Sequence, residues 1–260
     1  DPYIAEPPKR PYLEEVEKSP GKLRIGYTAA HTMGFPVDEA CVQAMNKSVA
    51  VLRAEGHEVS EVELPYRKED LTEAFLVVVA GELAGEIGVM SQYLGRKARA
   101  SDMEASTYAF YLLGRSFSAA DYTFAKHKWD EISRRIAVFH EKYDLMLTPT
   151  LAKRPIAIGS LQPTATEKRM MAVVNTFGLG SAIKATISSL ADKIYDYMPW
   201  TPLANLTGQP SMSVPFYRTP EENLPVGVMF TARLGEEDML FRLAGQLEKA
   251  APWAGEKAKM

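Results

Sequence analysis

The stretch Leu23-Arg24-Ile25-Gly26-Tyr27-Thr28 alternates apolar and polar side chains, as a strand with one buried face does. A helix is predicted after the loop that follows, because Asp38 is a good N-cap residue and Gly56 suits a left-handed C-cap. Its apolar face consists of Cys41, Met45, Val49 and Leu52. A second strand is predicted at 59–64, ending at Pro65. The order strand, helix, strand predicts a βαβ unit with parallel strands, and therefore an α/β fold.

The middle of the chain is predicted to be mostly helical. Apolar residues recur at three and four spacing in segments 70–95, 103–115 and 118–142. Residues 144–148 predict a short buried strand that Pro149 ends. Segment 159–200 has no regular period, so we expect loops around short helices. The remaining predicted elements are strands at 211–215 and 226–230 and a final helix with the apolar residues Leu240, Leu243, Ala244 and Leu247.

The composition of the 260 residues is that of an ordinary globular protein, with 46% hydrophobic and 24% charged residues. The net charge of -3 and the dispersed Lys and Arg residues leave no electrostatic footprint for nucleic acid. The longest apolar stretches, such as 74–80, are shorter than the ~20 residues of a membrane helix, so no membrane partner is expected. The single cysteine, Cys41, cannot form an internal disulfide, which favours a reducing, cytoplasmic setting.

The first 20 residues are predicted to be a linker-like segment, separate from a domain at residues 21–260. Prolines at positions 7, 8, 11 and 20 keep this segment out of a sheet interior and favour an extended conformation. The chain begins at Asp1 without an initiator methionine or a secretory leader, so we expect it to be part of a longer protein.

Motifs for nucleotide, redox and metal cofactors are missing from the sequence. It contains no Gly-x-Ser-x-Gly elbow, phosphate loop, His-Glu-x-x-His or paired Cys-x-x-Cys, so no cofactor and no metal site is expected. The four histidines lack metal-ligand spacing. His31 is a candidate binding residue, because it follows the first strand at the carboxyl edge of the predicted sheet, where α/β folds bind ligands. The alternative is an ordinary solvated loop histidine.

A Ser-x-x-Lys pattern occurs twice, at Ser19 to Lys22 and at Ser181 to Lys184. Such a pair could in principle provide a serine nucleophile and a lysine base. Chance matches are expected in a chain with this many Ser and Lys residues, so ordinary surface polarity is the competing interpretation. Neither serine is assigned as a nucleophile.

The segment 199–215 contains the run Asn205-Leu206-Thr207-Gly208-Gln209-Pro210 and predicts a Gly/Pro-punctuated loop that enters a buried strand. This run, followed by Leu224-Pro225-Val226-Gly227-Val228, resembles the C-terminal part of amidase-signature enzymes. The resemblance extends over about residues 20–250, because further stretches occur in the order usual for that family. These stretches are Leu23–Tyr27, Val37–Asp38, Glu55–Val59 and Tyr143–Thr150.

The resemblance implies an α/β/α fold with a mixed sheet between helices, and hydrolysis of a carboxamide bond through an acyl-enzyme. In that family a serine nucleophile is served by a second serine in a cis peptide and by a lysine, with oxyanion donors from a Gly/Ser-rich loop. All of these elements lie upstream of the matched stretch. The resemblance therefore implies no catalytic residue in this chain, inactivity of the chain alone, and two partners: a small amide substrate and a missing N-terminal half.

The resemblance also implies that this half supplies part of the acyl-binding pocket, near the region 176–184 and the loops after residue 148 and at 199–209. The expected pocket residues are Thr148, Pro149, Thr150, Trp200, Asn205 and Gln209. The Gly56-His57-Glu58-Val59 form resembles the bacterial branch of the family that acts on cyclic amide dimers of aminohexanoate.

Two alternatives stay open. The chain could be a noncatalytic α/β domain that binds a small molecule or acts as a scaffold, or an independent hydrolase that uses Ser181 and Lys184. If an edge of the sheet normally pairs with a missing half, unpaired backbone would also favour a homo-oligomer.

Overall fold

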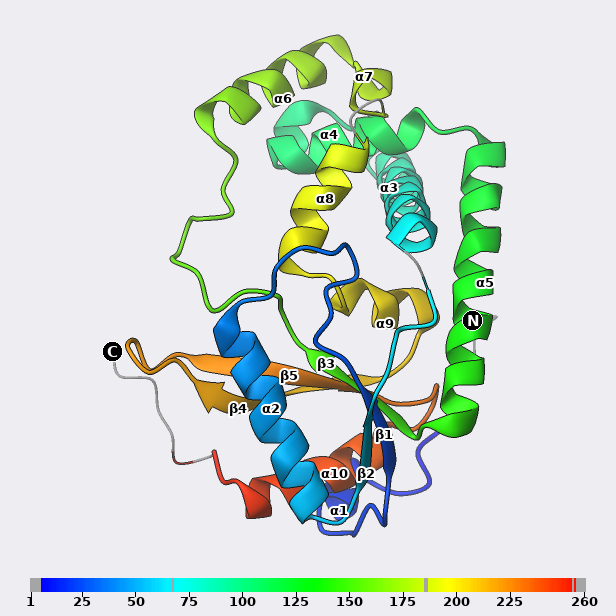
Figure 1. Cartoon of the computed structure of the whole chain (residues 1–260). Coiled ribbons are helices and arrows are strands. Elements are labelled where there is room, and N and C mark those ends of the chain that lie inside the picture. Colours follow the sequence, from blue (N-terminus) through cyan, green and yellow to red (C-terminus); the bar gives the residue numbers. More distant parts are fainter. Residues whose placement is uncertain (1–5, 67, 185–186, 254, 256–260) are drawn as a thin grey trace. The chain divides into compact units, whose positions relative to one another are not determined.

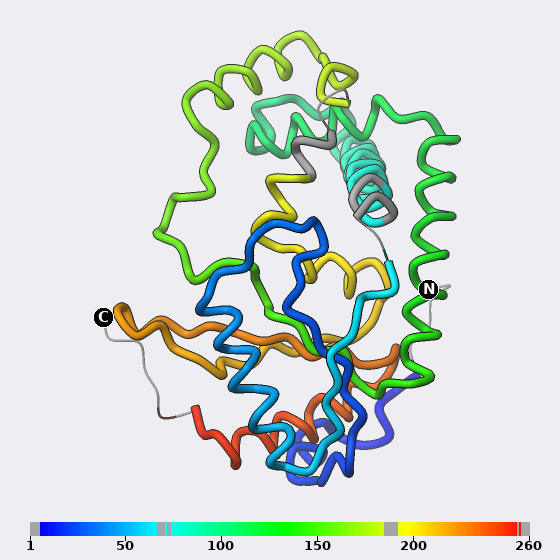
Figure 2. The backbone as a smooth tube through the Cα atoms, viewed as in Figure 1, coloured from blue at the N-terminus to red at the C-terminus, as the bar shows by residue number. Residues whose placement is uncertain are grey.

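The computed structural model of the chain describes residues 6–66, 68–184, 187–253 and 255. The chain divides into two compact units (Figure 1). The first unit contains residues 1–67, 132–156 and 195–260, and the second contains residues 68–131 and 157–194. Figure 2 traces this path from the blue N-terminal part through the cyan and green helices to the orange and red C-terminal part. The first unit is therefore assembled from three separate parts of the chain.

A mixed five-stranded sheet forms the centre of the first unit. Its strands are β1 (Arg24–Tyr27), β2 (Glu58–Glu61), β3 (Leu145–Pro149), β4 (Ser211–Arg218) and β5 (Pro225–Thr231), in the order β2-β1-β3-β5-β4. β1 pairs in parallel with β2 and with β3, whereas β5 is antiparallel to both β3 and β4. The predicted α/β fold with a mixed sheet is confirmed.

The helix α2 (Glu39–Ala54) connects β1 to β2 and begins and ends as its sequence predicts. The Asp38 carboxylate accepts a hydrogen bond from Ala40 N at 2.9 Å, as an N-cap side chain does. Gly56 has a φ of 90°, a left-handed backbone conformation that a side chain would strain. The parallel pairing of β1 with β2 confirms the βαβ unit.

Two helices, α2 and α10 (Glu237–Ala250), cover one face of the sheet (Figure 1). Between them and the strands lies the main core of the first unit, in which Ile25, Leu147 and Phe230 are fully buried. Burial of one such side chain contributes roughly 1.5–3 kcal/mol, so this packing is a major stabilising term for the unit.

The end of α5 (Ala119–Lys142) and the helix α9 (Thr201–Thr207) lie against the opposite face of the sheet. A Cβ atom on Gly26 of β1 would stand 2.8 Å from the Phe139 ring, so only glycine allows this close approach of α5. Trp200, at the start of α9, packs with Met229 of β5. Helices on both faces make the first unit an α/β/α sandwich, as the family resemblance implies.

The N-terminal segment differs from the extended linker predicted from its prolines. Residues Tyr12–Glu15 form the short helix α1, which follows Pro11. Glu15 is only 2% exposed, and its carboxylate accepts a hydrogen bond from Arg242 Nε at 2.6 Å and forms an ion pair with Arg10, whose Nε lies 2.7 Å away. The prolines flank the helix without interrupting it, and the ion pairs hold it on α10, which the local sequence could not show.

Residues 199–209 also differ from the predicted loop, because 201–207 form α9. Pro202 stands in the first turn, where its missing N–H costs no helical hydrogen bond, and Gly208 ends the helix with a φ of 73°. The strand that follows, β4, is an edge strand with Ser211 and Ser213 exposed, so the expected buried strand is half exposed.

The second unit is helical in the residues that the structure describes. Its elements are α3 (Lys68–Tyr93), the 3-10 turn η1 (Ala100–Asp102), α4 (Ala105–Arg115), α6 (Ala165–Phe177), α7 (Gly180–Lys184) and the first parts of α5 and of α8 (Ile187–Tyr197). The helices α3, α4 and α5 confirm the helical segments predicted at 70–95, 103–115 and 118–142. α6 is more regular than expected, because Thr164 and Glu167 form a capping box and Gly178 adopts a left-handed C-cap.

Among the described residues, one helix is long and apolar enough to cross a membrane when judged by length and composition alone. The stretch Ala74–Tyr93 of α3 has 20 residues and a mean hydropathy of 1.7. A third of it is buried within the structure, where Ala74 and Val78 pack with Ala125 of α5. A core helix passes the same test, so one such helix is weak evidence for a membrane span.

Gly114 lies where α4 touches α3. A Cβ atom there would stand 1.9 Å from the Ala80 carbonyl oxygen, so Gly114→Ala must separate the two helices. We expect this variant to lower the free energy of unfolding by about 2–3 kcal/mol in urea denaturation. Gly85→Ala in α3 is the matched control, because its Cβ would meet nothing within 4 Å and alanine favours a helix. Wild-type stability of Gly114→Ala would contradict the close packing.

Asp144 ties the start of β3 to β1 and to the segment after β5. Its Oδ1 accepts hydrogen bonds from Arg24 Nη2 at 2.9 Å and from Arg233 Nη2 at 3.2 Å. Partial burial raises the pKa of Asp144, but the hydrogen bonds from the two arginines outweigh it and lower that pKa to about 2. Asp144 therefore stabilises the fold above its ordinary pKa of 3.8, and this contribution is lost as the pH falls toward 2.

We expect Asp144→Asn to lower the free energy of unfolding at pH 7 by roughly 1 kcal/mol, after allowance for solvent screening of the partly exposed ion pairs with Arg24 and Arg233. The difference from the wild type should shrink steadily between pH 4 and pH 2, measured by urea denaturation at several pH values. A difference that does not change with pH would mean that the charge of Asp144 is not its cause.

Candidate functional site

The three parallel strands end at one edge of the sheet, where their loops are bonded together. Thr28, after β1, donates its N–H to Leu147 O of β3 at 3.1 Å. Asp38 N donates to Ala152 O at 2.8 Å, and Ala152 N donates to Tyr197 O at 3.0 Å. The carboxyl edge of parallel strands is where open α/β sheets place their ligands. This edge is therefore the candidate site.

A hollow of about 660 Å³ lies at this edge, next to the ends of β1 and β2. Its lining residues are Thr28, Ala30, His31, Thr32, Glu61, Val62, Glu63, Leu64 and Tyr66. Its size lies within the roughly 300–1,000 Å³ typical of small-molecule sites. The lining combines apolar side chains with hydroxyl, imidazole and carboxylate groups, which is the usual composition of a specific binding site.

His31, the histidine singled out from the sequence, is a buried wall of this hollow. Its Nδ1 accepts a hydrogen bond from Met33 N at 3.0 Å, and its ring lies 6.0 Å from the Trp200 ring. Burial lowers the pKa of His31 against the opposing effect of the Asp196 backbone carbonyl. The imidazole is therefore neutral at pH 7 and acts as a hydrogen-bonding group, not as a positive charge.

Several polar atoms at or beside this edge are buried without a hydrogen-bond partner among the described residues, including the Tyr66 hydroxyl, Thr148 Oγ1 and Trp200 Nε1. Burial raises the pKa of Tyr66, so its hydroxyl keeps its proton. A buried polar group without a partner costs about 1–3 kcal/mol, and groups of this kind call for a specific explanation, such as a binding role.

A row of hydroxyl groups crosses from the end of β3 to the edge strand β4. Thr150 Oγ1 and Ser213 Oγ share a hydrogen bond of 2.6 Å, and Ser211 Oγ and Thr231 Oγ1 share another of 2.8 Å. Gly227 of β5 leaves room for the first pair, because its Cβ would stand 2.6 Å from Ser213 Oγ and 2.9 Å from Thr150 Oγ1. The alternating Ser-x-Ser pattern of β4 could have revealed this row from the sequence.

Four of the six expected pocket residues lie near one another in the structure. Thr148 and Pro149 form the buried end of β3, and Thr150 follows them. Trp200 packs with Ala152 and with Met229, the β5 partner of Thr148. This group is the part of the expected pocket that lies at the carboxyl edge.

The structure places the other two expected residues elsewhere. Gln209 Nε2 lies 2.7 Å from Ala232 O and 2.7 Å from His140 Nε2. His140 precedes β3, so Gln209 lies at the amino end of that strand, opposite Thr148. Its amide connects α5 to the segment that follows β5, and Asn205 is exposed on α9.

Ion pairs fix the loop that follows β3. Arg154 Nε donates to Asp38 Oδ2 at 2.9 Å, and this hydrogen bond lowers the pKa of Asp38. Lys153 is paired with Asp196. The loop is thereby held to the start of α2 and to residues just before α9, which keeps Thr150 and Trp200 in fixed positions.

Glu61, Glu63 and Tyr66 are lining residues that the sequence analysis did not single out. They follow β2, whose carboxyl end lies at the same edge as that of β1. His31 was selected because it follows a parallel strand at the carboxyl edge of the sheet. The same criterion, applied to the end of β2, would have selected Glu61, Glu63 and Tyr66.

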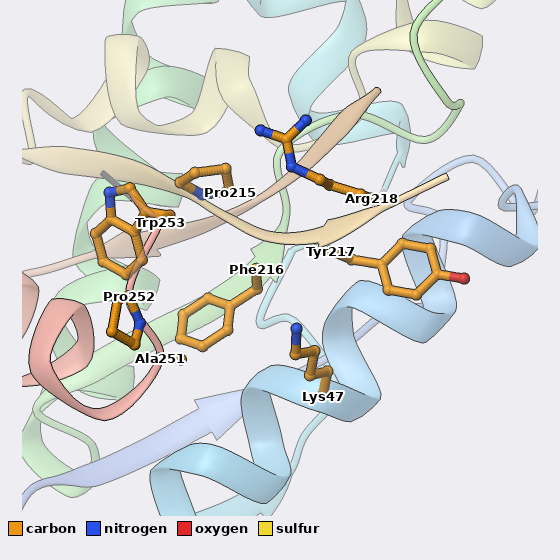
Figure 3. Close-up of a pocket in the computed structure, with 8 residues that line it drawn as sticks. All are labelled: Lys47, Pro215, Phe216, Tyr217, Arg218, Ala251, Pro252 and Trp253. Carbon is orange, nitrogen blue, oxygen red and sulfur yellow. The ribbon is translucent and has the colours of Figure 1, made fainter. Parts of the chain in front are cut away.

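A second hollow, of about 330 Å³, lies beside β4 (Figure 3). Lys47 of α2, residues 215–218 of β4 and residues 251–253 after α10 line it. Arg218 there donates to Asn223 O at 2.8 Å. None of these lining residues carries a buried polar atom without a partner, so this hollow is a weaker candidate than the carboxyl edge.

The Ser-x-x-Lys pairs are not arranged as a nucleophile and a base in the described structure. Lys184 Nζ donates to Asp121 Oδ2 at 3.0 Å, so this amine is engaged in an ion pair with a carboxylate. Ser19 accepts a hydrogen bond from Gly21 N in a tight turn. Among the described residues, no group of three or more His, Cys, Asp or Glu side chains could hold a metal ion.

A family model described as Amidase matches residues 1–241. The chain belongs to the amidase family. Its similarity to curated amidases extends over most of its length. The 6-aminohexanoate-cyclic-dimer hydrolase of Pseudomonas sp. (strain NK87) is 26% identical over 273 residues, covering 100% of this chain and 50% of that protein. The lipoamidase of Enterococcus faecalis is 28% identical over 227 residues, covering 86% of this chain and 31% of that protein.

Solved amidase structures share the fold. The structure of 6-aminohexanoate cyclic dimer hydrolase has a TM-score of 0.79 at 24% identity, covering 99% of this chain and 51% of that one. A bacterial aryl acylamidase of the amidase signature family has a TM-score of 0.67 at 17% identity, covering 94% of this chain and 46% of that one. The resemblance to amidase-signature enzymes is confirmed, and this amidase-family chain spans about half the length of the cyclic-dimer hydrolases that it matches.

The hydrogen-bonded hydroxyls of Thr150 and Ser213 leave no room for a side chain on Gly227. Gly227→Ala displaces the Ser213 or Thr150 hydroxyl, and we expect it to lower the free energy of unfolding by about 1–3 kcal/mol. Ser213→Ala removes the nearer clashing atom. The double variant should therefore recover part of that loss in a double-mutant cycle measured by urea denaturation. Strict additivity of the two substitutions would contradict the contact.

Proposed function

We propose that this chain is the C-terminal half of an amidase that hydrolyses carboxamide bonds by a Ser/cis-Ser/Lys acyl-enzyme mechanism. The observation that carries the proposal is the family match over residues 1–241, in a chain half as long as the cyclic-dimer hydrolases. Lys184, the lysine of the Ser181 pattern, is engaged by Asp121 in the described structure, which argues against a base for Ser181. The nucleophile, the base and the oxyanion donors would come from the other half.

In this mechanism the serine hydroxyl attacks the amide carbonyl while the lysine, through the second serine, takes its proton. The leaving amine then departs with a proton, and water releases the acid from the acyl-enzyme. Preorganised N–H donors stabilise the oxyanion of each tetrahedral intermediate. The role proposed for this chain is binding: Thr148, Pro149, Thr150 and Trp200 at the carboxyl edge would form one wall of the substrate pocket.

The two edges of the sheet suggest where the other half pairs. β2 has four residues and carries Glu58 and Glu61, and charged, short edge strands resist further pairing. β4 has eight residues, and its first four, Ser211–Val214, carry no charge. The proposed partner strand of the missing half, or of a second copy of this chain, would therefore add to β4.

The proposed substrate is a small carboxamide, in a cytoplasmic setting consistent with the single buried thiol of Cys41. A noncatalytic small-molecule-binding domain is the second candidate, which the hollow at the carboxyl edge favours. The two functions differ in whether amide hydrolysis appears when the other half is supplied.

The test compares the chain alone with the chain joined to the polypeptide encoded directly upstream in the same reading frame. We expect the chain alone to leave 6-aminohexanoate cyclic dimer and hexanamide intact, and the joined protein to release acid and amine, followed by chromatography. Ser181→Ala in the joined protein is the control and should leave the rate unchanged. Hydrolysis by the chain alone would contradict the proposal that the catalytic residues lie in the other half. Binding without hydrolysis in both forms would favour the noncatalytic binding domain.

A further inference from the structure

His140 is a buried imidazole whose two ring nitrogens both have a partner. It lies in the last turn of α5 and is 3% exposed. Its Nδ1 is 3.1 Å from Tyr143 O, and its Nε2 is 2.7 Å from Gln209 Nε2. A backbone carbonyl can only accept a hydrogen bond, so Nδ1 carries a proton and donates it to Tyr143 O. In the neutral ring Nε2 then carries no proton and accepts a hydrogen bond from the Gln209 amide.

Two further contacts fix the orientation of the Gln209 amide. Its Nε2 also donates to Ala232 O at 2.7 Å, and its Oε1 accepts a hydrogen bond from Thr207 Oγ1 at 2.8 Å. If the amide turned over, its oxygen would face the Ala232 carbonyl oxygen, and two acceptors that face each other form no hydrogen bond. The amide therefore presents an N–H group to His140, and only a ring nitrogen without a proton can accept it.

Protonation of His140 is incompatible with this arrangement. The imidazolium carries a proton on both ring nitrogens, so its Nε2–H would face an N–H of Gln209 at a separation of 2.7 Å. Two donors that face each other are both left without an acceptor, which is costly where water is excluded. The contact between His140 and Gln209 therefore forms in one protonation state of the imidazole only.

The charged groups around His140 come from several elements. Arg233, after β5, donates to His140 O from Nη2 at 2.6 Å and from Nε at 3.1 Å. Burial lowers the pKa of His140, and the positive charge of Arg233 adds to this effect. The hydrogen bond to Tyr143 O and the negative charge of Asp144 act in the opposite direction without cancelling it. Other charged residues nearby are Arg24, paired with Asp144, Glu236, paired with Arg233, and the exposed Glu141 and Lys142 of α5.

We propose that His140 and Gln209 form a pH-sensitive lock, which is closed when His140 is neutral and opens when it is protonated. The lock ties the end of α5 to the turn between α9 and β4 and, through Ala232, to the segment after β5. Acid therefore loosens the turn that leads into β4. The lock lies at the amino end of β3, away from the carboxyl edge, so it does not depend on the proposed amide hydrolysis.

The protonation states give the sign of the pH dependence. In the unfolded chain His140 takes up a proton near its ordinary pKa of 6.5, whereas its pKa in the folded chain is lower. The contribution of the lock to stability is therefore fully present above about pH 6.5 and is lost as the pH falls from there toward the lower pKa of the folded chain. This window lies above the pH range in which the contribution of Asp144 is lost.

The first experiment measures urea denaturation between about pH 7.5 and pH 5. His140→Gln removes the titrating ring, so we expect the unfolding equilibrium constant of the wild type to rise relative to that of His140→Gln, by up to about tenfold for each pH unit. His127→Gln, at an exposed histidine of the same helix, is the matched control and should follow the wild type. Equal pH dependence of the wild type and His140→Gln would overturn the proposal.

Gln209→Glu should reverse the sign of the effect. A carboxylate in place of the amide accepts a hydrogen bond from the protonated imidazole, so the lock of this variant closes on protonation. Relative to the wild type, its unfolding equilibrium constant should fall as the pH decreases over the same range. A constant loss of stability from the carboxylate beside Ala232 O leaves this trend unchanged. The wild-type pH dependence in Gln209→Glu would speak against the lock.

NMR of the wild-type chain tests the lock without any substitution. Nitrogen-15 spectra of the histidine side chains should show a proton on Nδ1 of His140 at pH 7 and none on Nε2. The titration midpoint of this ring should lie below 6.5. A proton on Nε2 at pH 7, or a midpoint at or above 6.5, would contradict the proposed hydrogen bond from Gln209 and remove the basis of the lock.

Discussion

The backbone pairing of β3 with β1 on one side and with β5 on the other holds the first unit together. All five residues of β3 are buried, and the strand is the middle member of the sheet. It joins segments that are separated by more than half of the chain, since β1 begins at Arg24 and β5 ends at Thr231. The helices on both faces and the carboxyl edge depend on this pairing.

The direction of the strands places the candidate site. Because β1, β2 and β3 are parallel, the loops that contain His31, Tyr66 and Thr150 all begin at one edge. The backbone hydrogen bonds from Thr28 to Leu147 of β3 and from Asp38 to Ala152 then hold the loop after β1 to β3 and to the segment that follows it. Polar groups from distant parts of the sequence meet there in a fixed arrangement, which is the arrangement that selective binding needs.

If the chain is the C-terminal half of an amidase, as proposed, the same sheet explains how that half would be ordered without carrying the catalytic groups. The core between the sheet, α2 and α10 is complete within the first unit, so burial of apolar surface supports the fold. Catalysis, by contrast, needs a nucleophile and oxyanion donors placed within hydrogen-bonding reach of one carbonyl, and a single wall of a pocket cannot supply them.

Elements whose cause is local could be predicted from the sequence alone. Asp38 caps α2 through its own side chain, Gly56 takes the left-handed conformation that only glycine adopts without strain, and the apolar periods predicted the long helices. The βαβ order and the family resemblance together predicted the mixed sheet. Four expected pocket residues lie at its carboxyl edge, because that edge follows from strand direction.

Features that depend on contacts between distant residues could not be predicted before the folded structure was known. The prolines before α1 do not predict the ion pair between Glu15 and Arg242. Gln209 lies at the amino end of β3, because its side chain contacts His140 and Ala232 there. Tyr66 joins the site through the path of the chain after β2. Short-range patterns encode backbone conformation, whereas a contact between residues far apart in sequence exists only once the sheet has brought them together.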